Sequence, residues 1–557
     1  MKNSEKIICP LCSDKVDKLL YRFHIDDERN VIEKIKSQNP SWAENDGACS
    51  RCVDYYQTAI IREQRILPEI GPHFPIKSAD EFIILPTPLR VDAHPGYTGK
   101  GVTICFIDSG FYPHPDLVSN KNRIKKIIDV TGSQKVPSTG GDLGEAWHGT
   151  MTAVVCAGDG YTSKGLYKGI ASDAELVLIK VQDETGKITT GNIVKALQWV
   201  LDNHEVYNIR IVNISLADDE LVSYKTSRVD QLAEELIKQN IVVVAAVGND
   251  ENGNILPPAN SLNVIAIGGV DDDNNLDNGI IKAYHSTYGT TIDALSKPEL
   301  VAHAIWIAAP ILPGTKEQEE AKALYHLLDC LSTLSQYDNE SISQVQEYIY
   351  QTQLDTGILS KDEADIRKAI IQRIQTCKYI SPHYMHVDGT SFAAPIVSAV
   401  IAQMLEANPL LSVRNLRNVL FSTAKRIETI ISQRQGFGII RPRKALLKVL
   451  QKENVMKLHT SPFISKEKNT IEFLIENSCA EEISLAGSFN HWANDVLLLE
   501  PAKNGIWRIE IPMLPEGKYQ YKFLLDHRHW MEDVDNPYRE PDGFNGFNSI
   551  LIVEHQN

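Results

Sequence analysis

Three polar residues stand where the sequence predicts the ends of regular elements, and together they could perform nucleophilic chemistry. Asp108 ends the apolar run 102–107, His148 opens a run of small residues, and Ser391 begins a segment that predicts a helix to about residue 407. A serine hydroxyl attacks only when a base takes its proton, and a histidine base needs a carboxylate to fix its tautomer. Each residue alone is more often a turn former, a structural histidine or a helix cap. Their joint occurrence predicts acyl transfer.

Two further groups could stabilise the negative charge that such an attack creates. At a helix N-terminus, Ser391 has backbone N–H groups without helical partners and a favourable dipole. Asn249 follows the apolar run 241–247 and Gly248, so its amide is expected at the carboxyl edge of a sheet, where open α/β folds bind ligands. A Gly-Asn pair after a strand is more commonly only a turn, and that alternative stays open here.

The surrounding sequence predicts the elements that would position these residues. Short β-branched runs alternate with helix-length amphipathic segments, which is typical of a parallel sheet covered on both faces. The runs are 102–107, 175–181, 209–215, 241–247 and 264–270. Residues 314–378 interrupt this α/β pattern with a polar segment rich in Gln, Glu and Leu, which predicts inserted helices. They are equally consistent with a surface embellishment and with a lid or docking element.

The motifs around the three residues resemble those of the subtilisin-like serine proteases, the subtilases. D-S-G begins at Asp108, H-G-T at His148, and Ser391 lies in G-T-S-F-A-A-P, in this chain order. The resemblance covers roughly residues 90–450 and includes the segments 96–101, 168–174, 212–216, 245–249 and 297–301. It implies a three-layer subtilisin-like fold with a parallel sheet and helices on both faces.

The resemblance also implies roles. Asp108 would orient His148, His148 would act as general base and then general acid, and Ser391 would be the nucleophile. Asn249 and the Ser391 N–H would bind the oxyanion. The implied substrate-binding residues are Ser215, Leu216, Ala217, Ala245, Ala246, Val247 and Gly248.

Three departures from the family concern specificity. Ala217 stands where the family usually has Gly and could crowd the strand edge on which peptides pair. Val247 stands where the family usually has Ala and predicts a shallower S1 pocket, and Trp147 is unusually bulky before His148.

Calcium is common in the family, but the sequence marks no site for it, and the oxygen-rich run 271–275 is equally explained as a solvated turn. His114, His285 and His386 match no catalytic motif and are expected to make only local hydrogen bonds.

Four of the nine cysteines form two C-x-x-C pairs near the N-terminus, Cys9 with Cys12 and Cys49 with Cys52. Four thiolates in two knuckles suit a tetrahedral structural Zn²⁺ site, and the pattern resembles zinc ribbons. Two disulfides are the alternative, disfavoured because the N-terminus has no apolar signal segment. A redox dithiol would need only one pair. The thiolates and the missing signal peptide together predict a cytoplasmic protein.

The C-terminal residues predict a small β-sandwich with alternating strands and Gly, Pro and Asn turns. They resemble the glycogen-binding sandwich of AMPK-β type (carbohydrate-binding family 48), an immunoglobulin-like early set. Trp492, Lys522, Trp530 and Asn548 match that family's sugar-contacting positions, and aromatic faces with nearby polar groups suit an α-glucan. The alternative is a spacer whose aromatics lie in a core or an interface.

Composition adds exclusions. The net charge of −16 argues against nucleic-acid binding, and no run approaches the roughly 18 apolar residues of a membrane span.

The expected domains are a zinc-ribbon-like module (1–60), an extended connector (61–90), a protease domain (91–455) with the insertion 314–378, and a glycogen-binding-like sandwich (460–557). The leading hypothesis is a serine endopeptidase that acts on a protein or peptide and is localised or gated by its flanking modules, through a glycogen-like glucan or a protein partner. The alternative is a non-catalytic polysaccharide- or protein-binding scaffold on a silent protease fold.

Overall fold

The computed structural model describes most of the chain from residue 84 onward and a few segments before it. The described residues are 7–11, 15–16, 29–43, 46–48, 52, 56, 84–132, 146–275, 281–333, 347–355, 357–358, 361–451, 461–465, 468–477, 480–502, 505–536, 538–544 and 546–553. Cys12, Cys49 and most of the predicted connector 61–90 lie outside them.

The centre of the largest domain is a parallel sheet with the strand order β12-β8-β7-β6-β3-β5-β4, and β9 adds antiparallel to β8. Its strands are β3 (Thr103–Asp108), β4 (Ile124–Asp129), β5 (Glu175–Lys180), β6 (Ile209–Ile214), β7 (Val242–Ala246), β8 (Ile265–Asp271), β9 (Lys282–Ala283) and β12 (Leu300–His303). The carboxyl ends of the parallel strands share one edge, so polar residues that follow them are brought together there.

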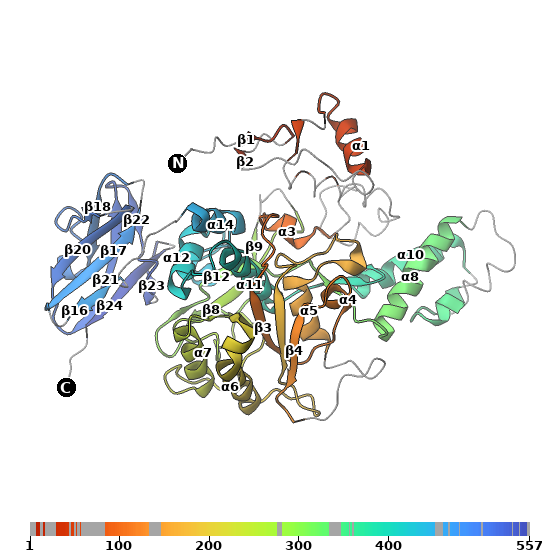
Figure 1. Ribbon diagram of the computed structural model, residues 1–557, viewed down its shortest axis with the longest axis horizontal. Coiled ribbons are helices and arrows are strands. Elements are labelled where there is room, and N and C mark those ends of the chain that lie inside the picture. Colours follow the sequence, from red (N-terminus) through yellow and green to blue (C-terminus); the bar gives the residue numbers. More distant parts are fainter. Residues whose placement is uncertain are drawn as a thin grey trace.

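Alternate residues of these strands face two different helical layers, as the period of two in a strand requires. Ile104 and Phe106 of β3 belong to the apolar cluster on one face, whereas Cys105 and Ile107 belong to the cluster on the other. The first face is covered by α5 (Trp147–Ala157), α11 (Thr390–Ala407), α12 (Val413–Thr423) and α14 (Pro442–Gln451), and the second by α6 (Thr190–Tyr207) and α7 (Arg228–Lys238) (Figure 1). This is a three-layer α/β domain.

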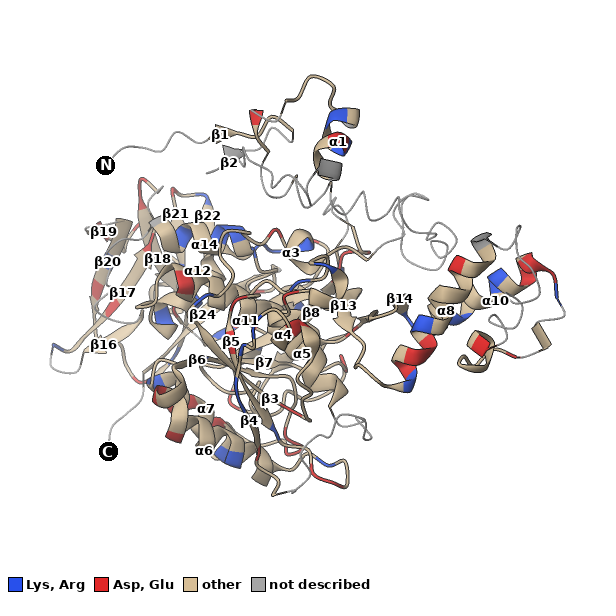
Figure 2. Ribbon diagram, turned by 45° about the vertical axis from the view of Figure 1, so that its right-hand side comes forward, with Lys and Arg blue, Asp and Glu red and all other residues tan. Residues whose placement is uncertain are grey.

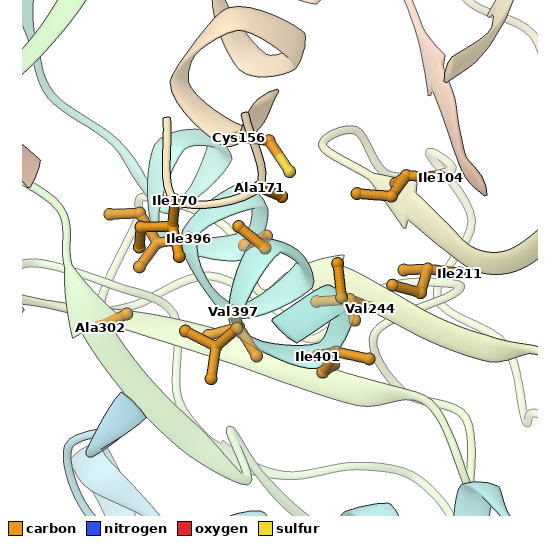
Figure 3. Close-up of a cluster of buried hydrophobic side chains, with 14 of the residues drawn as sticks. Ile104, Cys156, Ile170, Ala171, Ile211, Val244, Ala302, Ile396, Val397 and Ile401 are labelled. Carbon is orange, nitrogen blue, oxygen red and sulfur yellow. The ribbon is translucent and has the colours of Figure 1, made fainter. Parts of the chain in front are cut away.

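Helix α11 lies against the middle of the sheet. Figure 3 shows Ile396, Val397 and Ile401 of this helix among side chains from β6, β7 and β12. Its mean hydropathy of 1.3 would suit a membrane span, but 83% of that 18-residue window is buried inside the fold. The apolar composition of α11 is therefore explained by the core.

Two helices lie within the interruption predicted at 314–378, α8 (Lys316–Thr333) and α10 (Glu363–Thr376). They form a separate apolar core with a three-stranded sheet of β13 (Ile307–Pro310), β15 (Tyr384–Val387) and β14 (Tyr379–Ser381). Arg373 of α10 donates to Glu320 of α8 at 2.8 Å. Figure 2 shows acidic and basic residues along this helix pair.

The C-terminal residues form two packed antiparallel sheets. One contains β16 (Phe463–Ser465), β17 (Thr470–Glu476), β20 (Ile506–Pro512) and β19 (Glu500–Pro501). The other contains β18 (Ile483–Gly487), β21 (Gly517–Leu525), β24 (Phe547–Val553), β23 (Arg539–Pro541) and β22 (His529–Met531). Phe473, Tyr521 and Phe523 fill the space between the sheets.

The sandwich packs directly on the α/β domain, and Arg539 lies at the contact. This side chain is only 3% exposed. Its guanidinium lies 4.1 Å from the ring of Phe437 in the α/β domain and 4.6 Å from Phe547 in the sandwich. It also donates to the carbonyl of Pro298 at 3.2 Å, and Ser296 donates to the Arg539 carbonyl at 3.0 Å.

Shorter elements complete the described chain. These are β1 (Ile7–Ile8), β2 (Lys15–Val16), α1 (Arg29–Gln38), α3 (Thr87–Arg90), α4 (Pro115–Val118), the 3₁₀ turns Tyr161–Ser163 and Ser488–Asn490, β10 (Gly289–Thr290), β11 (Ser296–Lys297) and α13 (Ser432–Gln435). The predicted α/β domain and C-terminal β-sandwich are confirmed. The zinc module stays a prediction.

Candidate active site

Strand β3 ends in a buried carboxylate that is hydrogen-bonded to a histidine. His148, the second residue of α5, lies with Nδ1 2.7 Å from Asp108 Oδ1. The Ser109 N–H donates to the same oxygen at 2.7 Å, and Thr152 Oγ1 donates to Oδ2 at 3.3 Å. Because a carboxylate can only accept, Nδ1 carries the hydrogen, which leaves Nε2 as the basic nitrogen. This pair has the geometry of an oriented general base.

Opposing effects act on the pKa of His148. Burial of the ring lowers it, whereas the charge of Asp108 and the hydrogen bond to it raise it, and the net result is a pKa above the ordinary 6.5. Trp147 contacts the ring edge-on, with centroids 5.3 Å apart, and is itself 47% exposed. His148 therefore lies beside a tryptophan ring that is partly exposed to solvent.

Helix α11 places Ser391 in its first turn. The following residue, Phe392, packs with its ring centroid 5.8 Å from that of His148. The Ser391 hydroxyl donates to the carbonyl of Ser215 at 3.3 Å, and the Ser215 hydroxyl donates to the carbonyl of Ser391 at 3.0 Å. A reciprocal pair of bonds thus fixes the serine against the end of β6.

A buried polar pair fixes the helix register behind Ser391. Ser398, two turns along α11, donates to Asn213 Oδ1 on β6 at 2.9 Å, and Asn213 Nδ2 donates to the Ser215 hydroxyl at 3.0 Å. Sliding α11 along the sheet would leave these buried groups without partners, at a cost of about 1–3 kcal/mol each.

Two N–H donors are free beside Ser391. Asn249 Oδ1 accepts from the backbone N–H of Thr390 at 2.8 Å and from its hydroxyl at 2.9 Å, so the orientation of the amide is fixed. Neither Asn249 Nδ2 nor the Ser391 N–H bonds to any residue in the described part of the chain. Both can therefore donate to an oxyanion.

Gly389 permits the backbone conformation before Ser391. Its φ of +138° favours glycine. Its N–H donates to the carbonyl of Ala304, just after β12, at 2.7 Å. The serine loop is therefore tied to the carboxyl edge of the sheet.

The predicted substrate-binding residues fall into two groups. Ser215, Leu216 and Ala217 follow the end of β6, and along them the side chains pass from buried to exposed. Ala245, Ala246 and Val247 end β7 or follow it, and their side chains pack into the two core layers. The Val247 side chain is therefore buried within the fold and is not exposed to a ligand. Gly248, with φ of +110°, completes this second group.

Sequence reasoning missed the residues that hold the catalytic groups. Thr390 orients the Asn249 amide, Thr152 supports Asp108, and Phe392 packs on His148. The one available signal was spacing, because Thr152 lies four residues after His148 and so shares its helix face. The bonds of Thr390 join residues 141 positions apart, and no local pattern marks them.

The four predicted sugar-contacting residues lie together on the sandwich. Trp492 and Trp530 meet edge-to-face with centroids 6.1 Å apart, and Trp530 is 47% exposed. Lys522 pairs with Asp542, and Asn548 Nδ2 donates to the Gln520 side chain at 3.2 Å. The two polar residues are thus held by neighbours and keep further donor and acceptor capacity.

An exposed aromatic residue that the sequence reasoning did not select lies near this cluster. Phe544 is 91% exposed, and its N–H donates to Asp542 Oδ1 at 2.8 Å. Asp542 therefore links the turn that carries Phe544 to Lys522. Together with the two tryptophans, Phe544 gives this surface a third large apolar ring.

Two of the four predicted zinc ligands are described, and they meet. Cys9 Sγ and Cys52 Sγ lie 3.9 Å apart, both buried, in a small core with Trp42 and Tyr56. Thiolates about 2.3 Å from a tetrahedral zinc lie about 3.8 Å apart, whereas a disulfide is about 2.0 Å long. The described pair therefore fits a shared metal and not a disulfide.

The oxygen-rich run 271–275 is engaged in internal bonds. Asp272 accepts from Arg90 Nε at 3.1 Å and lies 3.2 Å from His303 Nε2, while Asp273 pairs with Lys282 at 2.7 Å. Among the residues that the structure describes, no group of three or more His, Cys, Asp or Glu is placed to hold a metal ion. His114 caps α4, and His386 stacks on Trp306 at 4.7 Å.

The Asp108–His148 pair gives a titration that can be measured directly. In a Ser391→Ala background, which prevents self-cleavage, we expect the ring protons of His148 to titrate above pH 6.5. Asp108→Asn removes the charge that raises the His148 pKa against the effect of burial, so the midpoint of the His148 titration should fall below pH 6.5. Histidine NMR resonances follow both changes, and the other histidines serve as the internal control. An unchanged midpoint would mean that the pair does not form.

Comparison with known proteins agrees with this geometry. A family model described as the subtilase family matches residues 99–438, and one described as the glycogen recognition site of AMP-activated protein kinase matches residues 473–557. Serine protease AprX of Bacillus subtilis is 26% identical over 333 residues, covering 58% of this chain and 61% of that protein. Subtilisin Savinase of Lederbergia lenta is 30% identical over 203 residues, covering 36% and 65%. The solved structure of Sphericase is 20% identical with a TM-score of 0.42, covering 62% of this chain and 92% of that one.

The matched region covers less than two thirds of each of these two curated relatives. The subtilase model, however, spans more than half of the present sequence and includes β3, α5 and the start of α11. A C-terminal region of the glycogen-recognition type follows it. The chain belongs to the subtilase family.

Proposed function

We propose that this protein is a serine endopeptidase that hydrolyses peptide bonds through Asp108, His148 and Ser391. The observation that carries the proposal is the oriented Asp108–His148 pair, which packs on Phe392, the residue after Ser391. The Ser391 N–H and Asn249 Nδ2, whose amide is held by Thr390, are unpaired within the described part of the chain. The similarity to a relative named as a serine protease, AprX of Bacillus subtilis, supports it. A protein or peptide is the substrate.

Each step of the proposed acyl transfer has a candidate group among these residues. The Ser391 hydroxyl turns about its Cα–Cβ bond from the Ser215 carbonyl toward His148, whose Nε2 takes its proton as Oγ attacks the substrate carbonyl. Asp108 holds the ring and stabilises the imidazolium. Asn249 Nδ2 and the Ser391 N–H donate to the oxyanion. His148 then protonates the leaving amine, and water hydrolyses the acyl-enzyme by the reverse sequence.

An active-site probe tests the proposal directly. A fluorophosphonate should label the folded chain at Ser391, and Ser391→Ala should abolish labelling and hydrolysis of an unfolded protein such as casein. Ser422→Ala, which changes an exposed serine of α12 away from the site, serves as the control and should remain labelled. Absence of labelling in well-folded protein would favour the alternative, a binding scaffold on a silent protease fold.

We further propose that Cys9, Cys12, Cys49 and Cys52 bind one structural zinc. The 3.9 Å separation of Cys9 and Cys52 supports this, and a closed four-thiolate site is structural because it leaves no coordination position for a substrate. Bound thiolates also favour a reducing compartment such as the cytoplasm.

Metal analysis of the purified chain should find about one zinc per molecule. Cys9→Ser with Cys52→Ser should lose it, because only two thiolates remain. Cys330→Ser, which changes a cysteine of the helical insertion, should keep a full complement. A zinc-free wild-type chain with a Cys9–Cys52 disulfide would contradict the proposal.

We propose that the sandwich binds an α-glucan and holds the protease at a glycogen-like polymer. The match to a glycogen recognition region and the exposed rings of Trp530 and Phe544 support this. Because Arg539 is buried between the two domains, the sandwich is seated on the protease and is not a loosely tethered module. A bound polymer would therefore lie close to the α/β domain.

Retention on glycogen beads tests the glucan proposal. Trp492→Ala with Trp530→Ala should weaken retention about tenfold or more, because stacking surfaces for sugar rings are lost. Trp147→Ala removes a tryptophan of equal exposure from the α/β domain and should leave retention unchanged. Retention that survives the double substitution would instead point to a protein-binding or spacer role.

A further inference from the structure

The loop that carries Asn249 is held from one side by a single short segment. The Thr287 N–H donates to the carbonyl of Gly248 at 3.1 Å, His285 Nδ1 lies 2.7 Å from the carbonyl of Asn249, and Thr287 Oγ1 donates to the carbonyl of Asp250 at 2.8 Å. Three consecutive carbonyls are thus bound by residues 285–287. The loop backbone is fixed through this segment.

His285 is the member of this set that holds Asn249 itself. Because a carbonyl oxygen only accepts, Nδ1 of His285 must carry the hydrogen. The His285 ring stacks on Tyr284, with centroids 4.0 Å apart and planes inclined by 33°. Tyr284 is buried, and its N–H donates to the carbonyl of Gly269 in β8 at 3.1 Å. The exposed histidine is therefore oriented by an anchored neighbour.

Arg434 of α13 supports the same loops from behind. It donates to the carbonyl of Tyr284 at 2.9 Å, forms an ion pair with Glu251 at 2.9 Å, and lies 5.1 Å above the ring of Tyr288. One guanidinium thus joins the segment after Asn249 to both ends of the segment 284–288.

We propose that His285 is a positioning residue for the oxyanion-binding amide of Asn249, and that Arg434 stabilises the loop pair behind it. The Asn249 side chain is fixed by Thr390, but its backbone is fixed by His285. Both ends of this residue must be held, because misplacing a catalytic donor by about 1 Å can cost about 10²-fold in rate. The inference rests on the proposed peptidase function.

The chemistry of the bond selects the variants. His285→Phe keeps an aromatic ring on Tyr284 but removes the donor, whereas His285→Asn places an amide N–H close to the position of Nδ1. We expect His285→Phe to lower kcat about tenfold with KM within about twofold. His285→Asn should restore most of kcat. His326→Phe, on the insertion helix α8, should have no effect.

A double-mutant cycle shows whether His285 acts through Asn249. Asn249→Ala should lower kcat by about 10²–10³. If the histidine acts only through this residue, adding His285→Phe to Asn249→Ala should change kcat by less than about twofold. The substrate is a fluorogenic peptide chosen by library profiling of the wild-type chain, and circular dichroism confirms folding of each variant.

The outcomes separate this inference from the function on which it rests. An active wild-type chain whose His285→Phe variant keeps full kcat overturns the positioning role while leaving the peptidase intact. Additive losses in the double variant also overturn it, because they show that His285 acts elsewhere. A wild-type chain that neither hydrolyses peptides nor reacts with a fluorophosphonate refutes the peptidase proposal itself.

Discussion

Burial of α11 against the central sheet is the interaction on which the rest of the site depends. Side chains such as Val397 and Ile401 are fully buried between the helix and the strands, and each contributes roughly 1.5–3 kcal/mol relative to exposure. Apolar packing alone would tolerate small shifts along the sheet. The buried Ser398–Asn213 hydrogen bond selects one register, and this register sets where Ser391 lies relative to Ser215 and Asn249.

The electrostatics of the site follow from that packing. Burial is the largest single effect on the His148 pKa and lowers it. Asp108 is buried where β3 ends, so its charge acts on His148 with little screening by water, and the charge and the hydrogen bond together outweigh burial. Thr390 bonds to the carbonyl oxygen of the Asn249 side-chain amide. Asn249 Nδ2 and the Ser391 N–H remain unpaired within the described part of the chain. The fold thus keeps one base and two donors ready while their supporting groups are bonded.

The alternation of apolar strands with amphipathic helices was sufficient to predict the α/β fold, because the period of two in the strands and the helix starts are local signals. The contacts that support the predicted site residues could not be predicted from the sequence. The Thr390 side chain bonds to the Asn249 side chain, 141 residues away, and the Ser296 side chain bonds to the Arg539 carbonyl, 243 residues away. Neither contact produces a periodic pattern in the sequence. The burial of Val247 was not predicted. The sequence shows that this residue follows a strand, but it does not show which helical layer the side chain packs against.

The sandwich and the oxyanion loop share one support. Arg539 is buried, and desolvation lowers its pKa, whereas the charges of Glu532 and Glu299 raise it. The rings of Phe437 and Phe547 and the Pro298 carbonyl also contact its guanidinium. Phe437 follows α13 by two residues, and α13 carries Arg434, which holds the loops beside Asn249. The segment around α13 therefore contacts both the sandwich, through Phe437, and the loop that carries Asn249, through Arg434.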